Sequence, residues 1–257
     1  MSLQTGKDAI DYIMNNHKKK KEFFPEAEDL GKPNVTFFGG EPSLLFDSLI
    51  VPLVLYAEEK YPNQMTFDMT TNGTLLNKDR LKFLKSHNIH ILLSMDGDEK
   101  TQNYNRPCKN GSPSFPLLEK NIPLILEYFP ETTFRCTINQ DTCDSLFESY
   151  LFAIKKGFKH IFFCPNARDI WSEENKNKLK IEIEKIFTYI TFSFMNNELP
   201  IQCSPIDITF QKILKHDLQV FYQDEEYLSP SRYPFRCGLG TTSASIGFDG
   251  KIFACQE

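Results

Sequence analysis

The sequence has no run of about 18 consecutive apolar residues, the length that a membrane-spanning helix needs. Its first segment, MSLQTGKDAIDY, lacks the basic-then-apolar order of a secretory signal. The net charge is -5, from 29 basic and 34 acidic residues, so the chain has no general electrostatic attraction for nucleic acid or for an anionic membrane. From these absences we expect a cytoplasmic protein with no nucleic-acid or membrane partner.

Cysteine occurs at seven positions but never as a C-x-x-C pair, and the number is odd. In a chain without a signal peptide, this scattered set favours reduced thiols over a disulfide framework. Cys136 and Cys164 fall in predicted strands, where we expect them to be buried as small hydrophobic side chains. With 40% hydrophobic and 25% charged residues among 257, the composition is that of a globular protein able to bury a sizeable core.

Short apolar segments alternate with helical patterns over most of the sequence. Five predicted strands cover residues 34–38, 65–70, 89–95, 132–139 and 160–164. This alternation predicts an α/β fold with a parallel sheet and right-handed connections, closed as a partial barrel; an open doubly wound sheet is the alternative. We expect a long loop up to Pro113, and then one helix over residues 115–129 with a kink at Pro123.

The alternation stops after about residue 200, where a polar, proline-containing stretch follows. Two short apolar segments then flank Asp249-Gly250, a pair typical of hairpin turns. We therefore expect two domains, a core of residues 1–224 and a small β element of residues 225–257.

Polar residues directly follow the first three predicted strands. These ends read Gly39-Gly40-Glu41-Pro42, Thr71-Asn72-Gly73 and Ser94-Met95-Asp96-Gly97, with Arg106 downstream. In a parallel sheet the carboxyl ends of the strands share one edge, where the active sites of β/α proteins lie. A single end of this kind is as readily an ordinary turn, whereas three in succession favour a site.

The residue types suit the zwitterionic end of an α-amino acid. Two glycines let a ligand approach backbone carbonyls that accept hydrogen bonds from an ammonium group, and Glu41 adds negative charge. Arg106 and Ser94 could bind a carboxylate, and Asn72 could serve hydroxyls or amides nearby. A surface ion pair is the alternative role for Arg106.

The segments FFGGEPSLLF, TTNGTLL and SMDGDEKTQNYNRP, in this order, resemble radical S-adenosylmethionine (SAM) enzymes. The resemblance spans Val35 to about Cys164 and implies that family's partial parallel (β/α)6 TIM-like barrel, with its first strand missing here. It also implies that GGEP binds the methionyl group of SAM, and that Ser94 and Arg106, twelve positions apart, hold its carboxylate as in the anaerobic sulfatase-maturing branch. The cofactor-binding candidates are Gly39, Gly40, Glu41, Pro42, Thr71, Asn72, Ser94, Asp96 and Arg106.

The end of the sequence carries a second resemblance. Cys237 is followed by twelve residues, Gly250, four residues and Cys255, and this C-x12-G-x4-C pattern is similar to the opening of a SPASM domain. The resemblance implies that Cys237 and Cys255 are metal ligands of an auxiliary iron–sulfur cluster. Two incidental cysteines are the alternative.

The radical-generating [4Fe-4S] cluster of the family requires a C-x3-C-x2-C triplet, which these 257 residues do not contain. We expect the missing ligands, the first barrel strand and the later SPASM cysteines to belong to a parent protein that extends beyond this sequence. A natural, cluster-free homologue is the alternative. The chain by itself is then expected to be inactive.

By resemblance, the parent protein is a radical SAM oxidoreductase that cleaves SAM at a [4Fe-4S] cluster and modifies a peptide or protein, for instance as a peptide or sulfatase maturase. The resemblance implies a peptide or protein substrate, auxiliary [4Fe-4S] clusters and a reductant such as flavodoxin or ferredoxin. A non-radical barrel enzyme that uses Glu41, Asp96 and Arg106 is one alternative, and a cluster-free peptide-binding scaffold is another. No catalytic acid or base is assigned.

Overall fold

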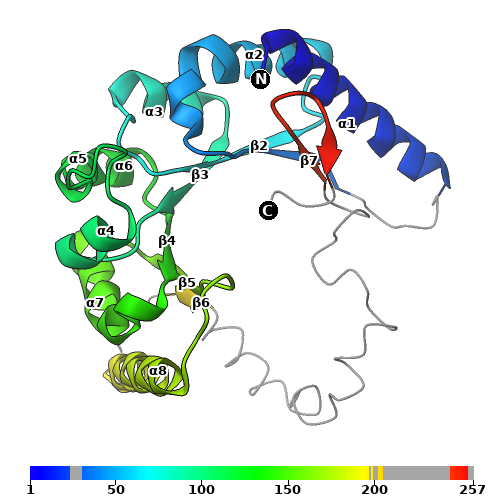
Figure 1. Ribbon diagram of the computed structural model, residues 1–257. Helices are drawn as coiled ribbons and strands as arrows, with labels where there is room; N and C mark the ends of the chain where they lie inside the picture. The colour runs from blue at the N-terminus through cyan, green and yellow to red at the C-terminus, as the bar shows by residue number, and fades with distance from the viewer. Residues whose placement is uncertain (24–30, 197, 199–201, 205–243, 254–257) are drawn as a thin grey trace. The chain divides into compact units, whose positions relative to one another are not determined.

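The computed structural model describes residues 1–23, 31–196, 198, 202–204 and 244–253, which form an α/β fold (Figure 1). The strands are β1 (Asn34–Phe37), β2 (Thr66–Thr71), β3 (Ile89–Ser94), β4 (Thr133–Ile138), β5 (His160–Pro165), β6 (Gln202–Ser204), β7 (Ser245–Ile246) and β8 (Ile252–Phe253). The α-helices are α1 (Leu3–Phe23), α2 (Val51–Lys60), α3 (Lys78–Ser86), α4 (Glu99–Asn105), α5 (Phe115–Glu119), α6 (Ile122–Tyr128), α7 (Leu146–Lys156) and α8 (Glu173–Met195). Shorter turns of helix are η1 (Pro42–Leu45), η2 (Phe46–Ile50) and η3 (Gln140–Ser145).

Six strands form one sheet in the order β1-β2-β3-β4-β5-β6, so that sheet neighbours are consecutive in the sequence. The pairings of β3 with β4, β4 with β5 and β5 with β6 are parallel. A helical connection between successive parallel strands returns the chain to the same end of the sheet. This is the arrangement of a partial TIM-like barrel, which confirms the predicted fold class.

The chain divides into two compact units. Unit 1 comprises Met1–Val35, Leu45–Phe67 and Gln211–Glu257, and unit 2 comprises Thr36–Leu44 and Asp68–Phe210. In unit 1, β7 and β8 form the predicted antiparallel hairpin, whose turn includes Gly250 at a φ of +83°. The predicted domain boundary near residue 225 lies outside the described residues.

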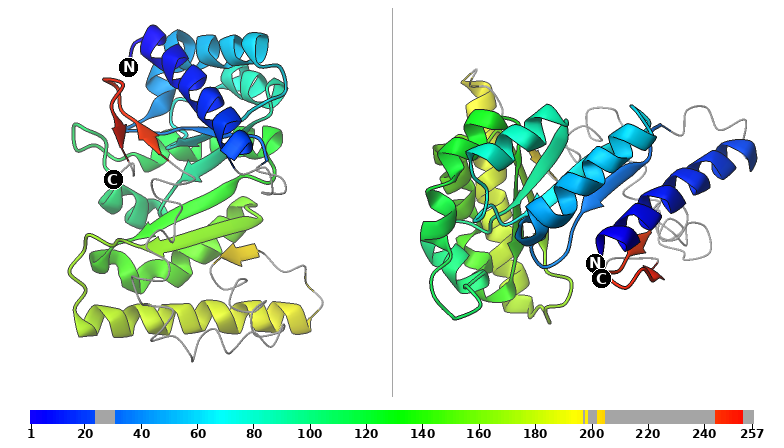
Figure 2. Two further views of the ribbon diagram at one scale, coloured as in Figure 1. Left: turned by 90° about the vertical axis from the view of Figure 1, so that its right-hand side faces the viewer. Right: turned by 90° about the horizontal axis from the view of Figure 1, so that it is seen from above.

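In unit 2, one face of the sheet is apolar and covered by helices. Alternate residues of β3, β4 and β5 are buried, namely Ile89, Ile91, Leu93, Phe134, Cys136, Ile138, Ile161 and Phe163. Helices α4 to α8 lie outside these strands in Figure 1, and the left view of Figure 2 shows the length of α8 beside them. The other face, here called the inner face, carries the remaining residues of these strands, most of which are partly or fully exposed.

Side-chain caps and a glycine fix the ends of the helices that position the strand ends. Asn77 Oδ1 accepts from the backbone N of Arg80 (3.0 Å) at the start of α3, and Asp98 Oδ1 accepts from that of Thr101 (3.0 Å) at the start of α4. Gly157, with a φ of +95°, ends α7 in the left-handed conformation that favours glycine.

Four sequence predictions are wrong in detail. The expected loop before Pro113 contains α4, because Asp98 caps a helix that the polar composition hid. The helix predicted over residues 115–129 is two helices, since a proline in the first turn starts α6. The alternation continues into β6, which at three residues is too short for a periodic signal. Cys164 is exposed, because it belongs to the inner face and not to the buried one.

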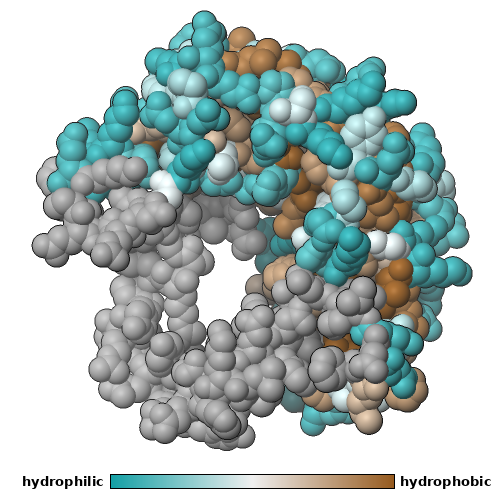
Figure 3. Space-filling view, turned by 180° about the vertical axis from the view of Figure 1, so that it is seen from behind, coloured by the Kyte–Doolittle hydropathy of each residue, from teal (hydrophilic) through white to brown (hydrophobic). Residues whose placement is uncertain are grey.

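Hydrophilic residues cover much of the coloured surface in Figure 3, and hydrophobic residues show between them. Among the residues that the structure describes, no helix combines the length and the apolar character that crossing a bilayer requires.

Candidate functional site

The loops after β1 and β2 are tied together by the Glu41 carboxylate. Its Oε1 accepts from Thr71 Oγ1 (2.7 Å) and from the backbone N of Ser43 (3.0 Å), and its Oε2 accepts from the backbone N of Asn72 (2.8 Å). Arg80 adds a second tie, because its Nη1 donates to the carbonyl of Ser43 (3.0 Å). The GGEP and TNG segments therefore converge as predicted, and Glu41 acts as a strut between them.

The backbone at Gly39 and Gly40 is open to a ligand. Both residues are exposed, and no heavy atom lies within 4 Å of the position that a Cβ would take on either one. Gly39 has a φ of +148°, which side-chain-bearing residues rarely adopt. Pro42 then begins η1, so the two glycines form an accessible stretch of main chain between β1 and a helical turn.

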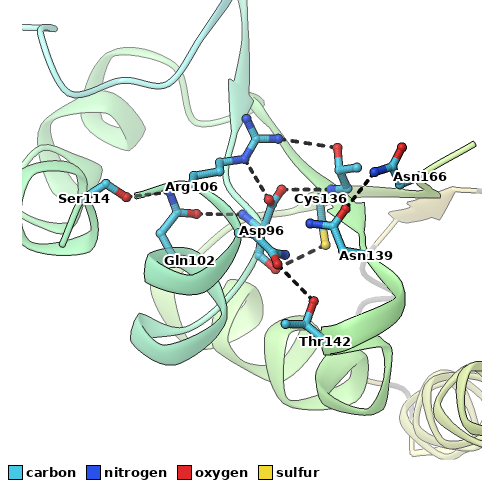
Figure 4. Close-up of polar contacts among 10 residues, drawn as sticks. Asp96, Gln102, Arg106, Ser114, Cys136, Asn139, Thr142 and Asn166 are labelled. Carbon is cyan, nitrogen blue, oxygen red and sulfur yellow. Dashed lines mark hydrogen bonds and ion pairs between the residues drawn. The ribbon is translucent and has the colours of Figure 1, made fainter. Parts of the chain in front are cut away.

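Asp96, which follows β3, joins the ends of β3 and β4 (Figure 4). Its Oδ2 accepts from Arg106 Nε (2.8 Å) and its Oδ1 from the backbone N of Thr137 (2.9 Å). Its backbone N donates to Gln102 Oε1 (2.9 Å), and its carbonyl accepts from Cys136 Sγ (3.2 Å). Both carboxylate oxygens and both main-chain polar groups of Asp96 therefore have protein partners, and the residue can influence a ligand only through its neighbours.

Arg106 is held in place and yet remains accessible. Its side chain is 30% exposed, against 2% for that of Asp96, and its Nη2 lies 3.4 Å from Thr137 Oγ1. The ion pair that was the alternative reading of Arg106 is thus present, but its carboxylate is buried. A guanidinium group has five N–H donors, so these two contacts leave donors that can meet a second carboxylate.

Further contacts join the ends of β4 and β5. Asn166 Nδ2 donates to Asn139 Oδ1 (3.0 Å; Figure 4), and the backbone N of Asn166 donates to the carbonyl of Ile138 (2.8 Å).

Burial, followed by the negative charge of Asp96, raises the pKa of the Cys136 thiol far above its ordinary value. Cys136 therefore stays protonated at neutral pH and serves as a hydrogen-bond donor, not as a thiolate.

Ser94 lies beside Arg135 on the inner face of the sheet. The two residues are register partners across β3 and β4, and Phe162 of β5 is the next residue in the same row. Ser94 is 6% exposed and Arg135 is partly buried. Sequence reasoning missed Arg135 and Thr137, although the alternation in TTFRCTIN sets both on the face opposite to the apolar residues of that strand.

The described residues fit one of the two cofactor groups that the resemblance implies. The open glycine backbone after β1, the buried serine hydroxyl at the end of β3 and the accessible arginine after α4 suit the ammonium and carboxylate groups of SAM. An iron–sulfur cluster has no fit in this part of the chain, where no three His, Cys, Asp or Glu side chains gather as metal ligands. Cys237 and Cys255 lie outside the described residues.

Comparison with known proteins supports the same family. Residues 15–142 match the model of the radical SAM superfamily. A cysteine-type anaerobic sulfatase-maturating enzyme of Clostridium perfringens (strain 13 / Type A) is 28% identical over 260 residues, which cover 92% of this chain and 62% of that enzyme. The chain thus spans about three-fifths of the length of this curated relative.

Two solved structures share the fold. Native anSMEcpe with bound AdoMet and Cp18Cys peptide has a TM-score of 0.66 at 22% identity, covering 83% of this chain and 58% of that one. Streptococcus suis SuiB bound to precursor peptide SuiA has a TM-score of 0.55 at 19% identity, covering 93% and 52%. The family match spans the GGEP, TNG and Ser94 segments and the sequence relative points the same way, so residues 15–142 of this chain are similar to the radical SAM superfamily.

Proposed function

We propose that this chain is the SAM-binding part of an enzyme that modifies a peptide or protein. The observation that carries the proposal is the Glu41 strut, which holds the open Gly39-Gly40 backbone against the end of β2. The relatives support the substrate class, because the curated one is named a sulfatase-maturating enzyme and the two solved structures are described with bound peptides.

In this proposal, each end of the methionyl group has its own partners. The carbonyls of the Gly39-Gly40 segment accept hydrogen bonds from the ammonium group, and Ser94 and Arg106 donate to the carboxylate. Glu41 and Thr71 act indirectly, since their side chains bond to one another and fix the loop. Pre-formed loops and a pre-oriented arginine lower the entropic cost of binding.

When bound together, SAM and a reduced [4Fe-4S] cluster supply abstraction of a hydrogen atom from the substrate. The cluster ligands are not among the described residues, so the contribution of the described residues is to bind and orient SAM. We extend the proposal to an auxiliary cluster on Cys237 and Cys255, and to a protein reductant such as flavodoxin or ferredoxin. The free thiols of the described cysteines support a reducing, cytoplasmic location.

Isothermal titration of the 257-residue chain with SAM tests the binding role directly. We expect measurable binding by the wild-type chain and a loss of roughly tenfold or more in Gly40→Ala, because a methyl group would fill the space that the ligand approaches. Arg168→Gln, at an exposed site after β5, is the matched surface control and should bind as the wild type does. No binding by the folded wild-type chain would reject the proposal.

The cluster part of the proposal has a separate test. After anaerobic reconstitution with iron and sulfide, this chain with dithionite and SAM should produce no 5′-deoxyadenosine, because its sequence holds no C-x3-C-x2-C triplet. Formation of 5′-deoxyadenosine would show that other residues hold the cluster, and would leave the binding result unaffected.

A further inference from the structure

Arg135 occupies an unusual position for a charged residue, in the interior of the parallel strand β4. It pairs in register with Ser94 of β3 on one side and with Phe162 of β5 on the other, and both neighbours are neutral. Its side chain points to the inner face, because Phe134 and Cys136 on either side of it are buried on the helix-covered face.

The Arg135 side chain makes no hydrogen bond or ion pair with any residue that the structure describes. A partly buried cation without an anionic partner loses part of its hydration and gains no compensating attraction. Arg106 differs from Arg135 in this respect, because its Nε lies 2.8 Å from Asp96 Oδ2 and the two side chains form an ion pair. Of these two arginines, Arg135 is the one whose charge the described residues leave uncompensated.

The side chains near Arg135 carry groups that can hydrogen-bond to a ligand. Ser94, the register partner, offers a hydroxyl, and Thr137, two residues further along the same face of β4, contacts Arg106 through its Oγ1. Thus two arginines and two hydroxyl side chains gather where β3 and β4 approach their carboxyl ends. A planar guanidinium group binds a carboxylate through two parallel N–H···O bonds, and neighbouring hydroxyl groups can complete the coordination.

We propose that Arg135 forms a carboxylate-binding site on the inner face of the sheet, distinct from the Asp96–Arg106 pair. The carboxylate can come from SAM, which Arg135 would then bind together with Ser94 and Arg106, or from an acidic group of the substrate, and these sources share the same chemistry. This inference rests on the proposed function only for the identity of the SAM ligand. The Arg135 site is a property of this chain's own residues.

The first arm of the test compares SAM with decarboxylated SAM, which lacks the carboxylate, by titration calorimetry of the wild-type chain, Arg135→Gln and Arg135→Lys. If Arg135 holds the SAM carboxylate, Arg135→Gln weakens SAM binding roughly tenfold or more and leaves decarboxylated SAM unchanged. Arg135→Lys restores part of the loss. Arg168→Gln, which removes the same charge from an exposed position, should change neither affinity.

The second arm uses N-acetyl-glutamic acid α-amide as a probe of a substrate carboxylate, with its glutamine counterpart as the neutral control. It is added with and without SAM. If Arg135 serves the substrate, the wild-type chain binds the acid in preference to the amide, and Arg135→Gln abolishes the difference without altering SAM affinity. Unchanged binding of both SAM and the acid by folded Arg135→Gln would overturn the inference.

A third measurement uses only the wild-type chain, so its result does not depend on whether a variant folds. The Nε–H resonance of Arg135, assigned in the wild-type chain, should shift on addition of whichever carboxylate ligand binds there, and not on addition of its neutral counterpart. The absence of a shift with all four ligands would also overturn the inference. Failure of the wild-type chain to bind SAM would reject the proposed function, while the probe without SAM would still report on Arg135.

Discussion

The carboxylate of Asp96 and the guanidinium of Arg106 form an ion pair at 2.8 Å in which the anion is 2% exposed and the cation is 30% exposed. The anion therefore cannot reach a ligand, whereas the cation can. A pair of this kind orients the long arginine side chain, which would otherwise lose about 2 kcal/mol of rotamer entropy when a ligand fixed it. Asp96, which was one of the predicted cofactor-binding residues, therefore acts as a positioning residue for Arg106.

Substitution of Asp96 by asparagine should destabilise the chain by about 1–3 kcal/mol, because a buried acceptor with two charge-assisted partners is replaced by an amide that can satisfy only one of them. Urea unfolding measures the change. The control is Glu131→Gln, which removes a carboxylate whose partners are the exposed Lys159 and the partly exposed His160. That variant should unfold at nearly the same urea concentration as wild type, because exposed ion pairs contribute little to stability. Equal losses in the two variants would contradict the structural role of Asp96.

Gly97 and Gly40 should respond differently to alanine. Gly97 has a φ of +154°, and a Cβ on it would lie 2.1 Å from Ser149 Oγ and 2.8 Å from Ser149 Cβ, so Gly97→Ala should cost about 2 kcal/mol or more in unfolding free energy. Gly40→Ala meets no atom within 4 Å and should leave stability within about 0.5 kcal/mol of wild type. Thermal and urea unfolding of both variants would detect the difference. A Gly97→Ala chain as stable as wild type would contradict the close approach of Gly97 to Ser149.

The described cysteines should react with iodoacetamide in the order of their exposure. Cys164 is exposed and should be alkylated in the folded chain, whereas Cys136 is buried and has a raised pKa, so that it reacts only after unfolding. Peptide mapping by mass spectrometry after timed alkylation, with and without urea, distinguishes the two sites. Rapid labelling of Cys136 in the native chain would contradict its burial beneath Asp96.

In unit 1, Asp11 should contribute to the loss of stability in acid. Burial acts to raise the pKa of Asp11, but hydrogen bonds from Lys60, Tyr61 and Tyr56 together lower it below the ordinary value. A lowered folded-state pKa gives stability that is present above the unfolded pKa of about 3.9 and is lost as the pH falls through the lower, folded value.

Asp11→Asn should therefore cost about 0.5–1 kcal/mol at neutral pH, a small effect because the Asp11 and Lys60 side chains are 29% and 45% exposed. The difference from wild type should shrink as the pH falls from about 5 to about 3. Urea unfolding across this range measures it. Parallel pH profiles for the two chains would show that the Asp11 cluster does not titrate as described.

Strand periodicity and strand-end motifs together predict much of this fold and site. The alternation along β4 and the run of polar residues after β1, β2 and β3 are local features, so the sequence shows them directly. The helix α4 was missed because its residues, EKTQNYN, are almost entirely polar, and only the capping Asp98 marks its start.

The functions of the individual side chains depended on contacts that the sequence does not display. Glu41 suited an ammonium group by its charge, yet its oxygens are used by Thr71, Ser43 and Asn72, which lie up to 31 positions away. The role of Arg135 emerges only from its register with Ser94, 41 positions earlier, because pairing between strands places the two side by side. Periodicity gives the face on which a residue lies, but not its partner.

The most direct test of this account is to map SAM binding by the ¹H–¹⁵N chemical shifts of the 257-residue chain. We predict that the largest changes occur at the amides of Gly39 and Gly40, at Ser94, and at the side-chain N–H groups of Arg106. Changes confined to other regions, such as α8, or the absence of any change at saturating SAM, would contradict the claim that these strand ends form one site for SAM.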